Sequence, residues 1–273
     1  MLTILNDIFA RRTLIWQLVL KNLKLRYYRP ALGFFWAVLG PFLFVSILYV
    51  VFSLILKVQS EHVPFFLYLM SAVFSWNFFQ ESLSASTTSL LDNRNLVKEA
   101  SFPHYLLPIS IAFANLLNFL PALAIIIVTS FVLLKGLPLF IIFLPAVLCL
   151  HLMITIGLSV MFSVFYVKHR DIKYILDAAL MFLFYLTPVF YPLRLARDSF
   201  PAFLFRLYSL NPFVGILNLY RVTLLKGFFA TIRDYIGPLS LMVMPIGFAV
   251  AVILAGFYCY ARQRTTINDY LSY

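Results

Sequence analysis

Long stretches without a charged side chain alternate with short charged segments along this chain. The uncharged stretches are residues 30–56, 62–80, 100–134, 136–167, 178–193 and 235–261. Crossing about 30 Å of hydrocarbon takes roughly 20 helical residues, and a charge at the centre of such a helix costs roughly 2.5–3.5 kcal/mol. Five stretches are long enough, whereas 178–193 has only 16 residues and needs Asp177 near its end or a distorted crossing. The pattern therefore predicts an all-α integral membrane protein with six transmembrane helices.

The first 30 residues are predicted to lie on the membrane surface. Five apolar residues share an arc of roughly 100° on a helical wheel: Ile8, Ile15, Trp16, Val19 and Leu23. Arg12 and Arg26 also fall within this arc, so the pattern is imperfect. We expect an amphipathic interfacial helix whose basic residues face anionic lipid headgroups.

The distribution of Lys and Arg gives the orientation. With both termini in the cytoplasm, 13 of the 21 basic residues lie inside, and the short loops obey the positive-inside rule. Residues 194–233 break the rule, because six basic residues would lie outside. Their side chains can reach outer headgroups. We expect one membrane unit over residues 1–273: an interfacial helix (1–30), spans one to five (31–192), an outer segment (193–235), span six (236–261) and a cytoplasmic tail (262–273).

The outer segment, residues 193–235, is apolar but is not predicted to cross the membrane. Its longest uncharged run, 207–220, has 14 residues, which is too few for a crossing. Asn211 and Pro212 are expected to break it into two pieces. The segment is therefore predicted to form short re-entrant or interfacial helices before the last span.

The composition excludes several classes of protein. Hydrophobic residues make up 63% of the chain and charged residues 11%, compared with roughly 25% charged in soluble domains, and the mean hydropathy is +0.96. A soluble enzyme, a disordered chain and a nucleic-acid-binding domain are thereby excluded. The two cysteines, Cys149 and Cys259, are far apart and give neither a disulfide framework nor metal-ligand spacing.

The sequence contains no recognisable catalytic apparatus. A Ser nucleophile elbow, a paired-His zinc motif, a carboxylate pair within a span and a phosphate-binding loop are all missing, so we expect no catalytic residue, metal or cofactor in this chain. His151 is expected to be a neutral imidazole bonded to a neighbouring helix; the alternative is a proton relay. Glu81 is expected to be an interfacial charge; the alternative is a substrate contact. A secondary transporter usually carries several buried ionisable groups for ion coupling. Few lie within these spans, so a transporter of this kind would take its energy from outside the chain.

Aromatic residues are the most informative excess, at 18% of the chain. Faces of the first and fifth spans carry the candidate path residues: Phe35, Phe42, Tyr49, Phe52, Phe184, Tyr185 and Tyr191. These rings could pack between helices or face lipid, where aromatic belts are expected. Alternatively they form a passage for sugar rings, which stack weakly on aromatic faces and can slide along them.

Five strings, spread over the chain in order, resemble the permease subunits of type-2 ABC exporters for O-antigen, capsule or teichoic-acid polysaccharides. They are RYYRPALGFFWAVLGP (26–41), LVKEASFPHYLLP (96–108), HRDI (169–172), LTPVFYP (186–192) and LNPFVGILNLYR (210–221). Many members have Arg-Glu where this chain has His104-Tyr105, so the details of docking are expected to differ here.

The resemblance implies a homodimer that binds two copies of a separate nucleotide-binding ATPase, which would hold ATP and Mg²⁺. It implies a lipid-linked polysaccharide substrate, contact with membrane lipids but not nucleic acid, and a place in the bacterial inner (plasma) membrane. The ATPase-coupling residues would be Lys98, Phe102, Pro103, His104, Arg170 and Asp171. The outer gate would include Arg194, Arg197, Asn211 and Pro212.

Two alternatives belong to other classes. A type-2 ABC exporter for a smaller substrate, such as a drug or lipid, would favour a narrow channel without aromatic faces. An integral membrane glycosyltransferase or phosphatase would need a set of metal-binding carboxylates at a membrane face, and the sequence has none.

Overall fold

The computed structural model describes residues 7, 10–27, 35–60, 63–97 and 102–272, excluding the side chains of residues 37 and 264–272. Throughout this part of the chain the regular structure is helical and contains no strand. The principal rods are α3 (Trp36–Tyr49) with η2 (Val50–Ile55), α4 (Phe65–Asp92), α6 (Leu106–Leu133), η3 (Leu139–Phe143) with α7 (Leu144–Lys168), α8 (Ile172–Leu186), and η4 (Leu239–Val243) with α13 (Met244–Ser272). The other helices are α2 (Arg12–Tyr27), α5 (Arg94–Val97), α9 (Leu193–Ser199), α10 (Ala202–Ser209), α11 (Pro212–Leu224) and α12 (Phe228–Arg233).

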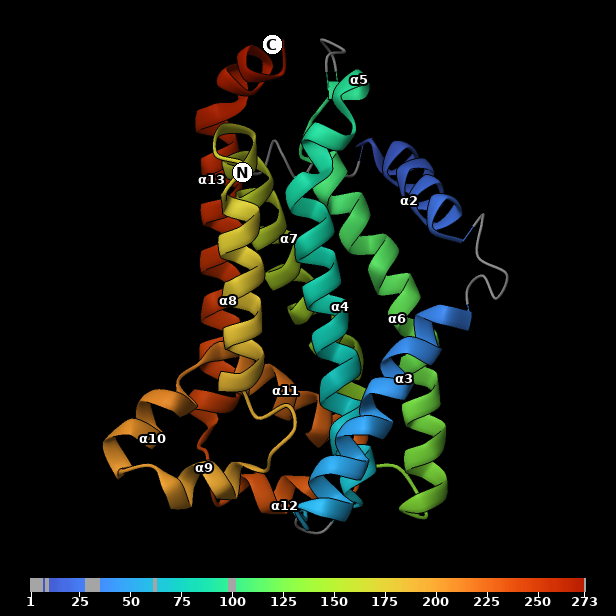
Figure 1. Ribbon diagram of the computed structural model, residues 1–273, viewed down its shortest axis with the longest axis vertical. Coiled ribbons are helices and arrows are strands. Elements are labelled where there is room, and N and C mark those ends of the chain that lie inside the picture. The colour runs from blue at the N-terminus through green and yellow to red at the C-terminus, as the bar shows by residue number, and fades with distance from the viewer. Residues whose placement is uncertain (1–6, 8–9, 28–34, 61–62, 98–101, 273) are drawn as a thin grey trace.

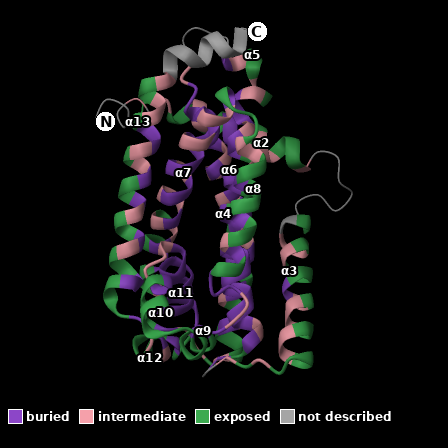
Figure 2. Ribbon diagram, turned by 60° about the vertical axis from the view of Figure 1, so that its left-hand side comes forward, coloured by how far each residue is buried: buried purple, intermediate pink, exposed green. Residues whose placement is uncertain are grey.

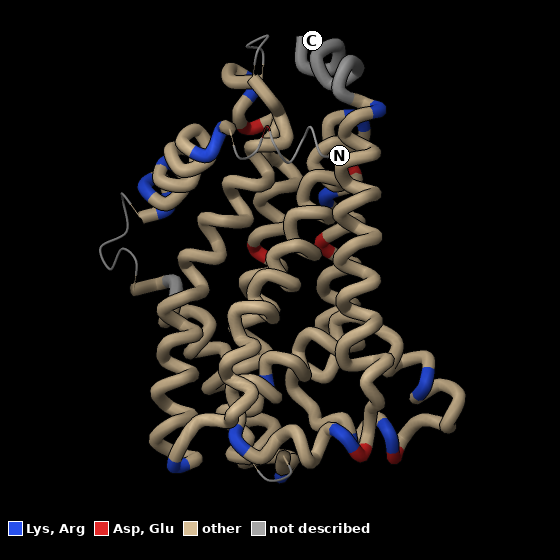
Figure 3. The backbone as a smooth tube through the Cα atoms, turned by 180° about the vertical axis from the view of Figure 1, so that it is seen from behind, with Lys and Arg blue, Asp and Glu red and all other residues tan. Residues whose placement is uncertain are grey.

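The rods run along the long axis of the molecule and form one bundle (Figure 1). Helices α2 and α5 and the C-terminal end of α13 lie at one end of this bundle. Helices α9, α10 and α12 lie at the opposite end, in the segment predicted to be outside (Figure 1). Lys and Arg gather near the two ends, and few charged residues lie between them (Figure 3).

Among the residues that the structure describes, four helical segments are long and apolar enough to cross a membrane, which confirms the prediction of an all-helical integral membrane protein. They are Val38–Ile55, Leu106–Leu133, Leu139–Lys168 and Leu239–Gln263. Each largely coincides with one of the predicted stretches. Helices α10 and α11 together form a fifth candidate, but the pair is bent by 73°. Six crossings would require α4 and α8 to cross the membrane as well. Neither is among the four segments, because α4 carries many polar residues and α8 has only 15 residues.

Helix α4 lies at the centre of the bundle and is buried on several sides. It continues to Asp92, well beyond the predicted stretch 62–80. Its buried hydroxyl groups fit into the apolar core because they donate to carbonyl oxygens of the same helix. Ser75 donates to the Ser71 carbonyl, Ser82 to that of Phe78, and Thr87 to that of Leu83. Buried hydroxyls that are satisfied in this way carry little of the usual desolvation cost.

Helices α7 and α13 pack closely against each other through two glycines. A Cβ placed on Gly157 would lie 2.6 Å from the carbonyl carbon of Val252, and one placed on Gly256 would lie 2.3 Å from the carbonyl oxygen of Gly157. Small residues at such a crossing let backbones approach closely, which is how helices associate in lipid. Helix α13 is therefore packed directly against α7.

Candidate functional site

Four of the seven predicted path residues form one aromatic cluster. The cluster is centred on Phe190, in the turn after α8. The Phe190 ring centroid lies 4.9 Å from that of Phe52, 5.7 Å from Phe184, 5.6 Å from Tyr185 and 5.2 Å from Tyr191. The cluster therefore joins η2 to the end of α8. Sequence spacing did not identify Phe190 as its centre.

The other three predicted path residues lie elsewhere along the first rod. Phe42 and Tyr49 each make an edge-on contact with Phe66 of α4, with ring centroids 5.9 and 5.6 Å apart. Phe35 lies just before α3 and is exposed. The single chain thus separates the predicted path residues into a cluster at the end of α8 and a second group along α3.

Helix α8 has one buried and one exposed face. Leu176, Leu180 and Phe184 recur every four residues and are buried on the side that meets α4. Tyr185, in contrast, is 56% exposed, and exposed residues predominate along α8 in Figure 2. Phe184 is therefore a packing residue of the single chain, whereas Tyr185 is presented outward. In a membrane such a face is covered by lipid, by another subunit or by a substrate.

Arg221 is completely buried, and sequence reasoning missed it by counting it among the outer basic residues. It has 0% exposure and its guanidinium carbon lies 3.4 Å from the centroid of the Tyr68 ring. Its Nη2 donates to the carbonyl oxygens of Pro188 at 2.6 Å and Val189 at 3.2 Å. The available signal was a single charge within the otherwise uncharged run 210–225.

The outer segment folds into four short helices with a boundary at the predicted position. The side chain of Asn211 accepts a hydrogen bond from the Phe213 amide at 3.0 Å, and Pro212 begins α11, so this pair caps the helix. Arg194 pairs with Asp198 at 3.4 Å. Arg197 donates to the Asp234 carbonyl oxygen at 3.1 Å and lies 5.3 Å from the centroid of the Tyr235 ring.

A groove of about 530 Å³ opens in the outer segment between α9, α10 and η4. Its lining combines aromatic, basic and hydroxyl side chains with one carboxylate, and includes Arg197, Phe200, Phe205, Arg206, Ser240 and Asp234. Rings beside guanidinium and hydroxyl groups can contact both apolar and polar parts of a ligand. Arg197 is the predicted gate residue that lines it.

At the opposite end, the predicted coupling residues differ in exposure. Arg170 and Asp171 are exposed in the turn between α7 and α8. Phe102 and Pro103 are half-buried, and Phe102 packs on the apolar cluster that includes Leu18. Lys98 lies outside the described residues.

His104 is buried, whereas Phe102 and Pro103 just before it are half-buried. Its Nε2 lies 3.1 Å from the Val97 carbonyl oxygen, and burial lowers the pKa of the imidazole from its ordinary value of 6.5. The neighbouring Tyr105 donates its hydroxyl to Asp7, and this bond, with one from Arg11, lowers the pKa of the carboxyl group. The His-Tyr pair therefore ties α5 and the segment before α2 to the start of α6.

Polar contacts attach α2 to the bundle and explain why Arg26 lies within the apolar arc. Arg26 forms an ion pair with Glu81 and donates to Asn115 Oδ1 at 2.6 Å. Lys21 Nζ donates to Asn93 Oδ1 at 2.8 Å. Arg26 lies within the apolar arc because its side chain points toward α4 and α6. Glu81 of α4 is its ion-pair partner.

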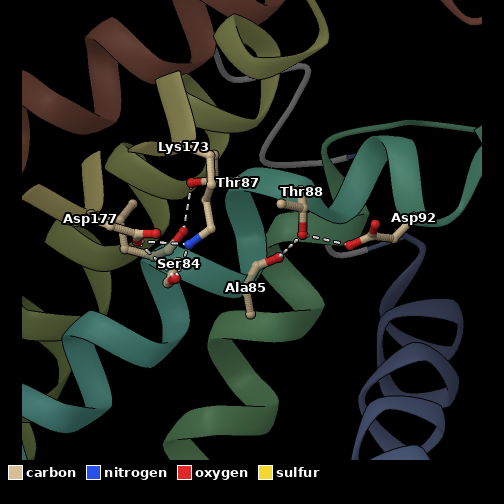
Figure 4. A network of polar contacts seen from close by, with 8 residues as sticks. Ser84, Ala85, Thr87, Thr88, Asp92, Lys173 and Asp177 are labelled. Atoms are coloured by element: carbon tan, nitrogen blue, oxygen red, sulfur yellow. Dashed lines mark hydrogen bonds and ion pairs between the residues drawn. The ribbon is translucent and has the colours of Figure 1, made fainter. Parts of the chain in front are cut away.

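A second polar network joins α8 to α4 near the coupling turn (Figure 4). Lys173 pairs with Asp177 at 2.7 Å, four residues further along α8, and also donates to Ser84 of α4. Ser84 in turn donates to Asp177 at 3.3 Å. The two charges inside α8 are thereby neutralised by each other, so the helix begins at Ile172 rather than after Asp177.

His151 lies in the core and contacts a neighbouring helix, as predicted. Its Nδ1 is 3.1 Å from the Tyr220 hydroxyl, and its ring packs edge-on to Phe78 at 5.0 Å. In the described part of the chain no group of His, Cys, Asp and Glu residues is arranged to hold a metal ion.

The helical bundle and its apolar rods define a multi-pass integral membrane protein. Residues 13–225 match the ABC-2 type transporter family, and the chain belongs to that family. It is also similar to the O-antigen export system permease protein RfbA of Myxococcus xanthus, with 28% identity over 81% of this chain and 84% of that protein. A protein of the same name from Klebsiella pneumoniae is 29% identical over 76% of this chain and 78% of its own length.

Proposed function

We propose that this chain is the membrane subunit of an ATP-driven exporter that moves a lipid-linked polysaccharide across the bacterial inner membrane. O-antigen or a similar surface glycan is the expected substrate. The observation that carries this proposal is the similarity to three O-antigen export permeases over 76–81% of the chain. ATP hydrolysis would take place on a separate subunit, which holds ATP and Mg²⁺.

The proposed complex contains two copies of this chain and two ATPase subunits. Each copy crosses the membrane six times with both termini in the cytoplasm. In support of this topology, α2, α5 and the end of α13 lie at one end of the bundle and α9, α10 and α12 at the other (Figure 1). Helix α8 would span only roughly 22 Å at 1.5 Å per residue, so its crossing is completed by the turn that follows it.

The substrate would pass between the exposed faces of α3 and α8 in the dimer. Phe42 and Tyr49 on the first rod, and Tyr185 on α8, would present rings that weakly stack on sugars without recognising one particular sequence. Arg194 and Arg197, with the helix boundary at Asn211–Pro212, would form the outer gate. Arg170, Asp171 and the segment that contains Phe102 would receive the ATPase.

The direct test is transport in vesicles that contain this chain together with the ATPase from a neighbouring reading frame. We expect ATP-dependent appearance of lipid-linked glycan on the face away from the ATPase, detected with a lectin. Vesicles without the ATPase, or with a non-hydrolysable ATP analogue, are the controls. ATP-dependent movement of a small lipid but not of glycan would replace this proposal with the smaller-substrate exporter.

A further inference from the structure

The turn after α8 leaves backbone carbonyl groups that no helix can satisfy. Helix α8 ends at Leu186, because Thr187 is extended and Pro188 has no amide hydrogen to donate. The turn is nevertheless in the interior, since Thr187 and Val189 both have 0% exposure. Buried carbonyl groups need partners, so the structure must supply donors at this position.

Two side chains from other helices supply these donors. Arg221 of α11 donates to the carbonyl oxygens of Pro188 and Val189 through one nitrogen, Nη2. Tyr68 of α4 donates its hydroxyl to the Tyr191 carbonyl oxygen at 2.9 Å. These two side chains also contact each other, because the guanidinium stacks on the Tyr68 ring. One stacked pair therefore holds three carbonyl groups of the turn.

No ion pair within the described residues includes Arg221. A buried cation without a carboxylate is costly, so carbonyl dipoles and an aromatic ring must stabilise it. Asn218 Oδ1 provides one more acceptor, at 3.3 Å from Nη1. Lysine could not reproduce this arrangement, because its compact ammonium lacks the planar face and the fork of donors. A buried charge that is held at this cost in a membrane protein indicates a functional role.

The turn that Arg221 holds carries the aromatic cluster of the proposed path. Phe190 is its centre, and the Tyr191 hydroxyl lies 3.1 Å from that of Tyr208 in α10. Helix α8 begins at the exposed coupling turn and ends at this cluster. A displacement of α8 would therefore reach the path rings and α10 through the turn.

We infer that Arg221 is a positioning residue that fixes the turn between α8 and α9 and so sets the arrangement of the path rings. This inference rests on the proposed function for its consequence in transport, but the fixation of the turn can be measured without transport. Loss of Arg221 should free the turn while the rest of α11 remains packed.

The experiment measures access to buried cysteines in purified protein. Cys149 and Cys259 are first replaced by Ala. Val189→Cys then reports on the turn, and Val214→Cys, also at a site with 0% exposure, reports on the core of α11. In the Arg221→Gln background we expect a small maleimide to label position 189 at least tenfold faster and position 214 at an unchanged rate. Arg233→Gln, on an exposed arginine of the same segment, should change neither rate.

Two outcomes would overturn the inference. Unchanged shielding at position 189 would mean that the turn holds without Arg221, and equal acceleration at both positions would mean that Arg221 only maintains the overall fold. If Arg221→Gln does not insert, Arg221→Lys is measured instead, with a severalfold acceleration expected at position 189 alone and the same two contrary outcomes. In transporting vesicles, the loosened variant should lose glycan export while ATP hydrolysis continues. A parent complex that exports no glycan would contradict the proposed function and leave the labelling result standing.

Discussion

Replacing Gly256 by Ala should destabilise the protein, because no Cβ fits where α13 crosses α7. A Cβ at position 256 would lie 2.3 Å from the carbonyl oxygen of Gly157 and 3.2 Å from its carbonyl carbon. Restoring an ordinary C···O contact of about 3.3 Å requires a separation of roughly 1 Å at this point. Overpacking costs about 1–3 kcal/mol, and the upper part of this range applies because the obstructing atoms are helical backbone.

Gly247→Ala is the matched control, since it lies in the same helix and a Cβ there meets nothing within 4 Å. It should stabilise α13 by up to about 1 kcal/mol through higher helix propensity. The two free energies of unfolding can be compared by circular dichroism in mixed micelles with increasing sodium dodecyl sulfate. If Gly256→Ala proves as stable as Gly247→Ala, the two helices do not approach as closely as argued, and the reasoning is refuted.

Three further predictions concern coupling, pH and the path. Phe102→Ala should lower ATP-driven export severalfold while insertion is retained, because truncating a packed interface aromatic costs about 2–4 kcal/mol; unchanged export and ATPase stimulation would count against it. Burial lowers the pKa of His104 below 6.5, so the folded protein favours the neutral imidazole. This stabilising contribution is fully present above pH 6.5 and is lost as the pH falls. Between about pH 7.5 and 5.5, thermal stability should therefore fall more in the parent protein than in His104→Gln. The double variant Phe52→Leu/Tyr185→Leu should insert but export less glycan, whereas Phe131→Leu, exposed on α6, should export normally; equal export would assign the rings to lipid contact.

The positions of the helices follow from the sequence to a large extent, because charge is excluded from apolar surroundings wherever it lacks a partner. Ion pairs explain where the predicted spans are shorter than the helices. Counting uncharged residues ended the second span at Gln80, but Glu81 pairs with Arg26, so α4 continues to Asp92. Likewise Asp177 pairs with Lys173, so α8 begins earlier than predicted. In both cases the partner is decided by packing that no count along the chain reveals.

The candidate site was predictable in its residue types but not in its grouping. Periodicity placed Phe42 and Tyr49 on one face, and both do contact Phe66. Periodicity within helices could not find Phe190, because it lies in an irregular turn. It also could not show that Arg221 is buried, since its partner Tyr68 lies far away in the sequence. Such contacts are decided by the tertiary packing of α4 against α11.

The burial of Arg221 and the length of the outer segment reduce the conflict with the positive-inside rule. Arg221 is not a surface charge at all, because it has 0% exposure. Other basic residues of this segment lie beside acidic groups or carbonyl oxygens: Arg194 near Asp198, Arg233 near Asp234, and Lys226 near the Lys135 carbonyl. The rule concerns charges that must be carried across the membrane during insertion, and long segments are less constrained by it. A cytoplasmic N-terminus is therefore compatible with basic residues at both ends of the bundle (Figure 3), and the orientation proposed above needs no special explanation for residues 194–233.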